Sequence, residues 1–434
     1  MKKINYYIIA LLDVLIFIFS SLFAFFTRFY IFKIGTPFEP RNIKAFINTL
    51  PFLTIIFIIF FVLYGLYSKK ESFYEIFASV LTSLILLFLV KLSLSYLLRE
   101  FAYPRSVIFI STVYEIIFLL LFRYFVFKYE KKIETKKFAV YIGEGEIFER
   151  YGKYEFKKLN GVDELNGIKE KIDAIFLLNN VKEREDIIKF AYENNIKIFL
   201  SPTLSDILLY SSNITNISDK PFFEISKINL TDEEKILKRI IDVLLSVLFL
   251  IILSPLFIII PILIKISSKG RIFYIQKRVG ENGKIFNLIK FRTMIEGAED
   301  NTGPILSNEK DERIYPVGKF LRKTHLDEIP QFINVLKGDM SIVGPRPERP
   351  EFFEEIEKKI PHFIYRVRLK PGITGLAQIV GKYDTTPEEK IKYDLIYIST
   401  WSPLLDLYIL FMTLKKILWM LLVSVKWLWI WIMI

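Results

Sequence analysis

The chain alternates long apolar runs with shorter polar, lysine-rich stretches. Four apolar runs fill its first third, and each has about the 20 residues that a helix needs to cross the hydrocarbon of a bilayer. These runs are residues 6–32, 48–67, 74–97 and 105–128. The pattern therefore predicts a bundle of four transmembrane helices within residues 1–135.

Charges at the ends of these runs predict their orientation. Lys2-Lys3 precede the first run, Lys69-Lys70 follow the second, and five lysines between 128 and 137 follow the fourth. Because cytoplasmic flanks are rich in lysine and arginine, both ends of the bundle are expected in the cytoplasm. Asp13 and Arg28 lie inside or at the edge of the first run. We expect them to form interhelix pairs or to reach the headgroups.

Residues 136–230 change to short apolar runs separated by polar stretches. The strand candidates are Lys137–Gly143, Asp173–Leu178 and Ile196–Leu200. Helix-prone stretches such as Lys182–Asn194 separate them, which predicts a small parallel α/β domain. Gly143-Glu-Gly145 lacks the third glycine of a dinucleotide fingerprint, and its glutamates would repel a pyrophosphate. A structural or regulatory domain is therefore favoured over a nucleotide-binding one.

A fifth apolar run, at about residues 238–265, differs from the first four. Lys238-Arg239 begin it and Lys265, Lys269 and Arg271 end it, so both ends carry the cytoplasmic mark. Ser254-Pro255 lies near its middle, where proline removes a backbone donor and bends a helix. The pattern favours a re-entrant helix, broken at Ser254 and Pro255, that enters and leaves by one leaflet. A kinked spanning helix is the alternative.

The chain ends on another apolar stretch, which begins at Leu404. It contains Trp419, Trp427, Trp429 and Trp431. Tryptophan and the interspersed lysines favour the headgroup region, so a C-terminal helix in the membrane interface is expected. Insertion of residues 417–434 is the alternative.

Composition supports the membrane assignment and narrows the chemistry. Of 434 residues, 52% are hydrophobic and 16% aromatic, which exceeds the balance of soluble proteins. The net charge of +12 suits anionic headgroups and phosphorylated substrates, and nucleic acid less specifically. The chain has no cysteine, which excludes disulfides, thiol chemistry and cysteine-bound zinc. We expect no nucleic-acid partner.

A basic segment after the fifth run contains two adjacent carboxylates, Asp327 and Glu328. Pro330 fits only the first turn of a helix, and an i, i+3, i+4, i+7 apolar face runs from Ile329 to Leu336. This pattern predicts a helix that starts near Asp327, where the helix dipole favours ionised carboxylates and attracts phosphate. Acidic residues are common in first turns, so the pair alone does not define a site.

Cations near this pair change its interpretation. They are Lys290, Arg292, Arg322 and Arg346. Arg346 lies between two prolines, which favours bidentate capture of phosphate at little entropic cost. The turn Lys370–Gly375 offers backbone N–H groups that could face an anion. Asp394 is either a second metal or substrate carboxylate or a solvated helix residue. Together these residues predict a phosphate-handling site.

Six motifs of this segment also occur in order in a known family. They are Lys277–Gly280, Lys290–Met294, Leu326–Gln331, Asn334–Asp339, Val343–Pro347 and Lys370–Gln378. Over about residues 235–414 the chain resembles the monotopic bacterial sugar transferases, the polyprenol-phosphate phosphoglycosyl transferases. Its helices and α/β domain resemble the large members, which begin exopolysaccharide, capsule or O-antigen synthesis.

The resemblance implies a fold that is membrane α-helical plus α/β. A four-helix transmembrane bundle would occupy residues 1–135, and a small Rossmann-like parallel α/β domain residues 136–230. A mostly helical cytoplasmic catalytic domain with the re-entrant helix would occupy residues 231–434, with the C-terminal membrane-interface helix at its end. The expected location is the bacterial cytoplasmic (inner) membrane.

The resemblance also implies the chemistry. Asp327 would attack the β-phosphate of a UDP-sugar, release UMP and form a phosphosugar–aspartyl intermediate, which undecaprenyl phosphate would then take up. Glu328 matches the carboxylate associated with Mg²⁺. Basic active-site positions fall on Lys290, Arg322 and Arg346, and an acidic one on Asp394. UDP-sugar, undecaprenyl phosphate and inner-membrane lipids are the expected partners.

Two other functions remain as alternatives. One is a membrane scaffold or sensor with a degenerate transferase domain, which the intact Asp-Glu pair, Lys290 and Arg346 disfavour. The other is a metal-dependent glycosyltransferase that releases UDP, for which we find no Asp-x-Asp motif. No residue identifies the sugar, and a homodimer through the bundle and the α/β domain is left open. His325 replaces a small residue common in the family and receives no role.

Overall fold

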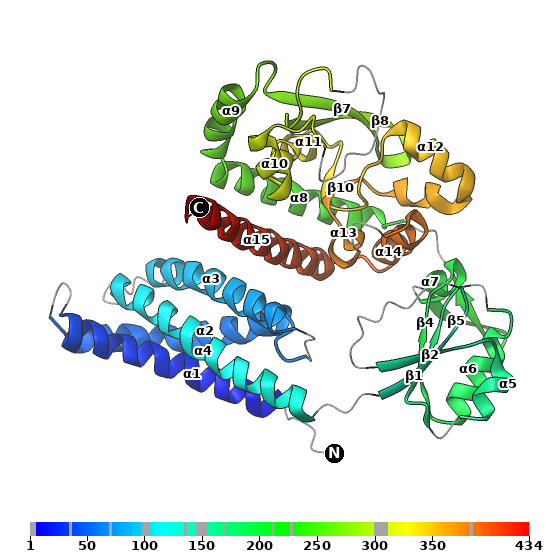
Figure 1. Cartoon of the computed structure of the whole chain (residues 1–434), viewed down its shortest axis with the longest axis horizontal. Coiled ribbons are helices and arrows are strands. Elements are labelled where there is room, and N and C mark those ends of the chain that lie inside the picture. The colour runs from blue at the N-terminus through cyan, green and yellow to red at the C-terminus, as the bar shows by residue number, and fades with distance from the viewer. Residues whose placement is uncertain are drawn as a thin grey trace. The chain divides into compact units, whose positions relative to one another are not determined.

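The fold was obtained from a computed structural model (Figure 1). It describes residues 6–33, 37–68, 72–97, 104–133, 137–144, 154–168, 171–179, 181–210, 212–225, 229–298, 311–381 and 385–433. The chain divides into two compact units, Met1–Ser201 and Pro202–Ile434.

The first unit begins with the predicted bundle. Its helices are α1 (Tyr6–Phe26) with the π-helical extension η1 (Thr27–Phe32), α2 (Pro40–Leu63), α3 (Phe73–Leu97) and α4 (Arg105–Ile133). All four are long and apolar enough to cross a membrane, so the four predicted spans are confirmed. α2 begins at Pro40 rather than at residue 48, because Glu39 and Asn42 form a capping box there.

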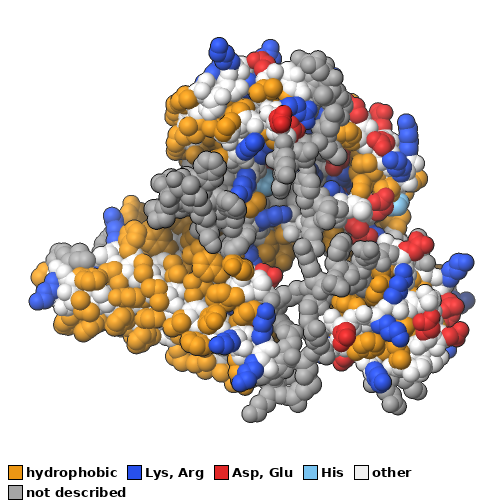
Figure 2. Space-filling model, in the orientation of Figure 1, with side chains coloured by type: hydrophobic (Ala, Val, Ile, Leu, Met, Phe, Trp, Pro, Cys, Tyr) orange, Lys and Arg blue, Asp and Glu red, His pale blue; other side chains and the backbone are white. Residues whose placement is uncertain are grey.

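The bundle has a buried core with several aromatic rings and an apolar outer surface. Phe17 and Phe57 stack with ring centroids 4.9 Å apart, and Phe61 lies beside them. The outer faces carry exposed leucine, isoleucine and phenylalanine, and Figure 2 shows this broad apolar surface over the helices. Such a surface requires lipid rather than water around it. The chain is therefore a membrane protein.

Charged residues inside the bundle are paired between helices. Asp13 of α1 forms a buried ion pair with Arg123 of α4, which confirms that Asp13 pairs between helices. Arg28 donates from Nε to Ser106 Oγ at 2.6 Å. Lys91 of α3 and Glu115 of α4, which the sequence analysis did not identify, pair at 2.5 Å and are both about 1% exposed. α4 thus provides a charged partner to two other helices.

Replacing Lys91 with methionine is expected to destabilise the bundle by roughly 3 kcal/mol or more, because Glu115 would remain buried without a countercharge. The double variant Lys91→Met/Glu115→Gln should recover most of that loss, since neither side chain is then charged. Thermal unfolding of the detergent-solubilised proteins measures both effects. Equal melting temperatures for the wild type and Lys91→Met would contradict the buried pair.

The α/β domain follows the bundle. Its strands are β1 (Lys137–Ile142), β2 (Tyr154–Leu159), β3 (Ala174–Leu177) and β4 (Lys197–Leu200). They form one parallel sheet in the order β2-β1-β3-β4, with helices α5 (Val162–Asn166) and α6 (Arg184–Glu193). The three predicted strands are confirmed, and the edge strand β2 was missed. The Glu144 N–H donates to Asn179 O, and Gly145 lies outside the described residues.

The second unit begins with small elements and a long bent helix pair. These elements are α7 (Leu204–Tyr210), the hairpin β5 (Asn213–Ile217) and β6 (Lys220–Glu224), α8 (Asp232–Ile252) and α9 (Leu256–Ser267). Ile207 of α7 packs in one apolar cluster with Phe353 and Leu395, which places α7 in this unit. The domain boundary predicted at residue 230 stays a prediction.

The break between α8 and α9 falls at Ser254-Pro255, as predicted, and the two helices are bent by 61°. Three polar residues of α8 are buried one turn apart, Lys238, Asp242 and Ser246. Leucines and isoleucines on its other face are exposed. α9 packs Ile260 and Ile264 into the same polar domain. Both arms therefore lie on one domain and present apolar faces away from it.

Two-stranded sheets and short helices complete this unit. They are β7 (Phe273–Val279), η3 (Glu281–Gly283), β8 (Ile285–Phe291), α10 (Pro316–Lys323), η4 (Leu326–Glu328), α11 (Gln331–Lys337), β9 (Ser341–Val343), α12 (Pro350–Lys359), η5 (Pro361–Arg368), β10 (Gly372–Thr374), α13 (Leu376–Val380) and α14 (Pro387–Ser399). β7 and β8 form an antiparallel hairpin, and β9 pairs with β10 in parallel.

The chain ends in the long helix α15 (Pro403–Met433). Its first turns pack Ile409 into the core of this unit, beside Val335, Tyr397 and Trp401. Trp419, Trp427, Trp429 and Trp431 lie outside the residues whose side chains are described. Their predicted anchoring in the headgroup region stays a prediction.

Candidate active site

Asp327 and Glu328 lie on the short 3₁₀ turn η4, ahead of α11. The predicted helix start is therefore wrong by one turn: α11 begins at Gln331, and Pro330 is its N-cap. His325 adopts a left-handed backbone (φ 56°) that ends α10, and Pro330 has no N–H to continue a helical ladder. These two breaks isolate the acidic pair on a turn of its own.

Glu328 is held by two cations from other elements. Lys290 Nζ of β8 donates to its Oε1 at 2.9 Å, and an Arg346 guanidinium nitrogen donates to the same oxygen at 3.0 Å. Glu328 is buried, and burial alone would raise its pKa. Arg346 and Lys290 outweigh burial and hold the pKa of Glu328 well below its usual range. Glu328 is therefore ionised.

Asp327 has the opposite environment. Its side chain is buried, and Oδ1 has no hydrogen-bond partner among the described residues. Burial, followed by the charge of Glu328, raises the pKa of Asp327 to about 6, although Lys290 and Arg322 act against the rise. A carboxyl with this pKa is still mostly ionised at neutral pH, although its charge is much less stabilised than that of Glu328. Asp327 has an oxygen that is poorly solvated and unpaired.

The two remaining predicted cations have different positions. Arg322, in the last turn of α10, lies close enough to Asp327 to interact with it electrostatically, and its Nε donates to Thr293 Oγ1 at 2.7 Å. Arg292 instead donates to the backbone oxygens of Lys269 and Ser268 at 2.6 and 2.9 Å. Arg292 thus fixes the end of α9. It does not belong to the cation cluster.

Arg346 reaches the site from a tightly held loop after β9. The Gly344 N–H donates to Thr374 O at 2.8 Å, and the Gly372 N–H donates to Pro345 O at 2.9 Å. The expectation that the Lys370–Gly375 turn offers its N–H groups to an anion is therefore wrong for Gly372. Both glycines are needed for close packing, because a Cβ on Gly372 would lie 2.1 Å from Gly344 N.

Asp394 does not join the acidic pair. It is buried on α14 and forms an ion pair with Arg366 at 2.9 Å. Arg366 also donates to the Arg346 backbone oxygen at 2.9 Å. Asp394 is therefore not a solvated helix residue, and its role as a second metal or substrate carboxylate stays a prediction. Asp394 supports the loop that carries Arg346, and Arg366 was missed because nothing in its sequence context distinguishes it.

Asn334 connects the acidic turn to the strand that carries Lys290. Its Oδ1 accepts from the Ile289 N–H at 3.0 Å, and its Nδ2 donates to Asn287 O at 2.7 Å. The side chain is fully buried on α11, two turns after Asp327. An amide both accepts and donates, so it can satisfy the edge of β8. Asn334 thereby fixes Lys290 relative to Glu328.

The residues fit a magnesium ion only together with substrate. Among the described residues no group of three histidines, cysteines or acids could hold a metal. Mg²⁺ commonly binds one or two carboxylates and takes its other ligands from substrate phosphate and water. Glu328, next to Asp327 on η4, supplies one carboxylate of that kind.

The fold and the site thus define a class: membrane proteins whose polar domain holds an acidic pair among cations beside a bent apolar helix. The sequence model of one family, described as bacterial sugar transferase, matches residues 233–420. Exopolysaccharide production protein ExoY from Sinorhizobium fredii is 39% identical over 194 residues, which cover 42% of this chain and 84% of that protein. The chain belongs to the bacterial sugar transferase family.

Longer relatives carry more specific names. The chain is 40% identical over 185 residues to UDP-N-acetylgalactosamine-undecaprenyl-phosphate N-acetylgalactosaminephosphotransferase from Aeromonas hydrophila, covering 42% of this chain and 44% of that protein. It is 36% identical over 256 residues to UDP-glucose:undecaprenyl-phosphate glucose-1-phosphate transferase from Klebsiella pneumoniae, covering 57% and 55%. The matched stretches span about half the length of these two relatives.

Proposed function

We propose that this protein transfers a sugar 1-phosphate from a UDP-sugar to undecaprenyl phosphate and so begins the synthesis of an exopolysaccharide, capsule or O-antigen. The names of the relatives support the reaction class and the acceptor, although they differ in the sugar they name. The observation that carries the proposal is the contrast within the acidic pair. Asp327 has a buried, unpaired oxygen, while the charge of Glu328 is compensated by Lys290 and Arg346.

The contrast suits a division of labour between two carboxylates. A nucleophile needs an oxygen that is not occupied by cations, and Asp327 Oδ1 meets that requirement. Lys290, Arg322 and Arg346 surround it with positive charge, which favours binding of the anionic diphosphate. Arg346 keeps 44% of its side chain exposed and is therefore accessible to a substrate phosphate.

The proposed reaction has two displacements at one phosphorus atom. An Asp327 oxygen attacks the β-phosphorus, the bond to the bridging oxygen breaks, and UMP leaves with that electron pair. A phosphate oxygen of undecaprenyl phosphate then attacks the same phosphorus and displaces Asp327 as a carboxylate. Neither step requires a general base, because both nucleophiles are already anionic.

We propose that Glu328 holds Mg²⁺ with the substrate diphosphate. Bound Mg²⁺ would neutralise phosphate charge that otherwise repels the Asp327 carboxylate. Within this chain, Lys290 and Arg346 keep Glu328 ionised and oriented for that role. Removal of the divalent ion with EDTA should therefore abolish the reaction, and added Mg²⁺ should restore it.

The membrane arrangement proposed is a re-entrant helix in the cytoplasmic leaflet of the inner membrane. The 61° bend and the packing of both arms on one polar domain support it, since a spanning helix would carry its second arm away from that domain. The exposed apolar faces of α8 and α9 would lie in the lipid. The site would then be at the membrane surface, where undecaprenyl phosphate presents its phosphate.

The product distinguishes this proposal from its alternatives. Purified full-length protein is incubated with Mg²⁺, undecaprenyl phosphate and one UDP-sugar at a time, and the nucleotide released is identified by chromatography. We expect UMP with at least one donor, and only when Mg²⁺ is present. Release of UDP would indicate a glycosyltransferase, and no nucleotide from any donor would indicate a scaffold or sensor.

A further inference from the structure

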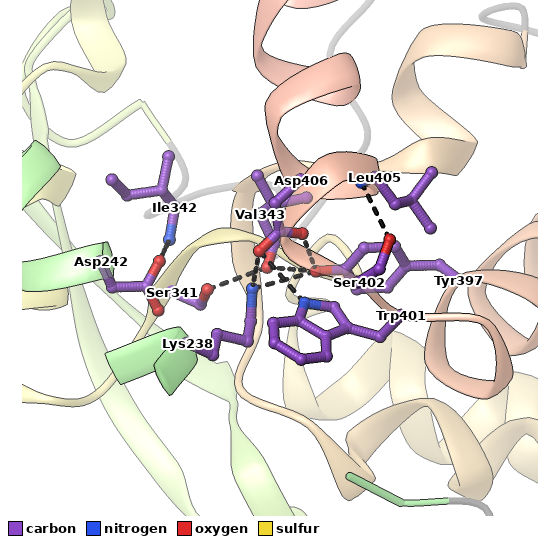
Figure 3. A network of polar contacts seen from close by, with 10 residues as sticks. All are labelled: Lys238, Asp242, Ser341, Ile342, Val343, Tyr397, Trp401, Ser402, Leu405 and Asp406. Atoms are coloured by element: carbon purple, nitrogen blue, oxygen red, sulfur yellow. Dashed lines mark hydrogen bonds and ion pairs between the residues drawn. The ribbon is translucent and has the colours of Figure 1, made fainter. Parts of the chain in front are cut away.

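A buried polar network lies behind the proposed site, where α8, β9, α14 and α15 meet (Figure 3). Lys238 Nζ of α8 donates to Asp406 Oδ2 of α15 at 2.7 Å and to the Tyr397 hydroxyl of α14 at 3.0 Å. Trp401 Nε1 donates to the same Asp406 oxygen at 3.1 Å. The network therefore joins the first arm of the bent helix pair to the C-terminal helix.

The two charged groups of this network, Lys238 and Asp406, are buried away from water and form an ion pair with each other. Lys238 and Asp406 are 5% and 4% exposed, and Tyr397 is 1% exposed. A buried ion pair offsets its desolvation only when further hydrogen bonds satisfy both partners. Here Trp401 and Tyr397 supply them, since the Tyr397 hydroxyl lies 2.6 Å from Asp406 Oδ1. Burial, followed by the charge of Asp406, raises the pKa of Tyr397 well above its usual range, so the hydroxyl keeps its hydrogen.

The same hydroxyl reaches the strand that leads to Arg346. Its oxygen lies 3.1 Å from Val343 O, so its one hydrogen is shared between that carbonyl and Asp406. One turn after Lys238, Asp242 Oδ1 of α8 accepts from the Ile342 N–H at 3.0 Å. Two consecutive residues of β9 are thus fixed by side chains from α8 and α14.

Between β9 and Arg346 the chain has little freedom to absorb a shift. The Gly344 N–H donates to Thr374 O, and Pro345 O accepts from the Gly372 N–H. The backbone oxygen of Arg346 accepts from the Arg366 guanidinium. Prolines on both sides of Arg346 restrict its backbone further. A displacement of Val343 would therefore move the Arg346 guanidinium relative to Glu328, and a misplacement of about 1 Å can cost a site up to 10²-fold in rate.

We propose that Tyr397 is a positioning residue for Arg346, and that through Asp406 and Lys238 it makes the membrane-associated helices α8 and α15 part of the active-site framework. This inference rests on the proposed function, because UMP release is its readout. Tyr397 touches no substrate in this proposal. It fixes Val343 and hence the guanidinium that would bind the donor diphosphate.

The test is the variant Tyr397→Phe, which removes the hydroxyl and keeps the ring. We expect UMP release from a donor that the wild type uses to fall about tenfold. The melting temperature should fall as well, because Asp406 loses a buried hydrogen bond, while membrane association should be unchanged. The control is Tyr408→Phe on α15, which has an exposed ring and should keep the wild-type rate. A wild-type rate for Tyr397→Phe overturns the proposal.

A double-mutant cycle separates positioning from general support of the fold. In an Arg346→Lys background, where the bidentate group is already lost, Tyr397→Phe should lower the rate less than about twofold. The same tenfold loss in both backgrounds would show that Tyr397 acts independently of Arg346 and overturns the proposal.

If Tyr397→Phe does not fold, the proposal is tested instead at Asp242, the other side chain that holds β9 in place. Asp242→Asn keeps an oxygen that accepts from the Ile342 N–H, whereas Asp242→Leu does not. The proposal expects Asn to retain most of the rate and Leu to lose it, and equal rates for both overturn it. Failure of the proposed function is distinct from all these outcomes, because the wild type would then release no UMP.

Discussion

Asp327→Asn is expected to abolish UMP release, by a factor on the order of 10³ or more, because an amide oxygen cannot serve as the anionic nucleophile. The variant should also lose the labelled protein that forms when wild type meets a donor with a radioactive β-phosphate and is then denatured. Scintillation counting of the precipitated protein and chromatography of the nucleotide measure the two losses.

The same substitution should leave the fold intact. Burial raises the pKa of Asp327, which means that its ionised form, although predominant at neutral pH, lowers the stability of the folded protein. Asparagine has the same shape without the charge, so the melting temperature should be unchanged or higher. The control is Glu351→Gln, an exposed carboxylate in the first turn of α12, which should keep full activity. Normal turnover by Asp327→Asn would refute a covalent aspartyl mechanism.

Gly372→Ala is expected to destabilise the second unit by roughly 3 kcal/mol or more. The new Cβ would lie 2.1 Å from Gly344 N and 2.4 Å from Thr374 O, and both are backbone atoms that cannot rotate away. Pairing of β9 with β10 would be lost, and Arg346 would move with it. Thermal unfolding followed by circular dichroism, together with UMP release, measures the outcome.

A second glycine provides the matched control for that variant. Gly283 has a positive φ of 77°, but a Cβ there would meet nothing within 4 Å. Gly283→Ala should therefore show only the cost of a left-handed backbone, about 1 kcal/mol. If the two alanine variants have the same melting temperature, the close approach of β9 and β10 is not the reason that position 372 requires glycine.

The parts of the fold that were predicted from sequence are those set by local pattern. Hydrophobic runs of bilayer length gave the four spans, and short apolar runs gave three of the four parallel strands. Strand β2 (Tyr154–Leu159) was not predicted, because it contains a glutamate and two lysines and is half exposed at the edge of the sheet. The break at Ser254-Pro255 was predictable because proline acts on its own backbone.

Most residues of the candidate site were predicted from the sequence, but their positions relative to one another were predicted less well. Lys290 and Arg346 do reach Glu328, but only tertiary packing could assign Arg292 to the end of α9. The 3₁₀ turn that contains Asp327 depends on the left-handed backbone conformation of His325, and no propensity rule requires that conformation of a histidine. Asp394 acts through Arg366, a partner 28 positions earlier in the sequence. Long-range pairs of this kind leave no local pattern.

The two buried ion pairs of the membrane bundle have a consequence for the order in which the chain is assembled. Asp13 and Lys91 enter the bilayer before their partners, Arg123 and Glu115, both of which arrive on α4. An unpaired charge inside a span costs about 3 kcal/mol at the centre on insertion scales, and less toward the ends, where Asp13 and Lys91 lie. The first three helices are therefore a strained intermediate during synthesis, and α4 releases that strain at two places when it is inserted.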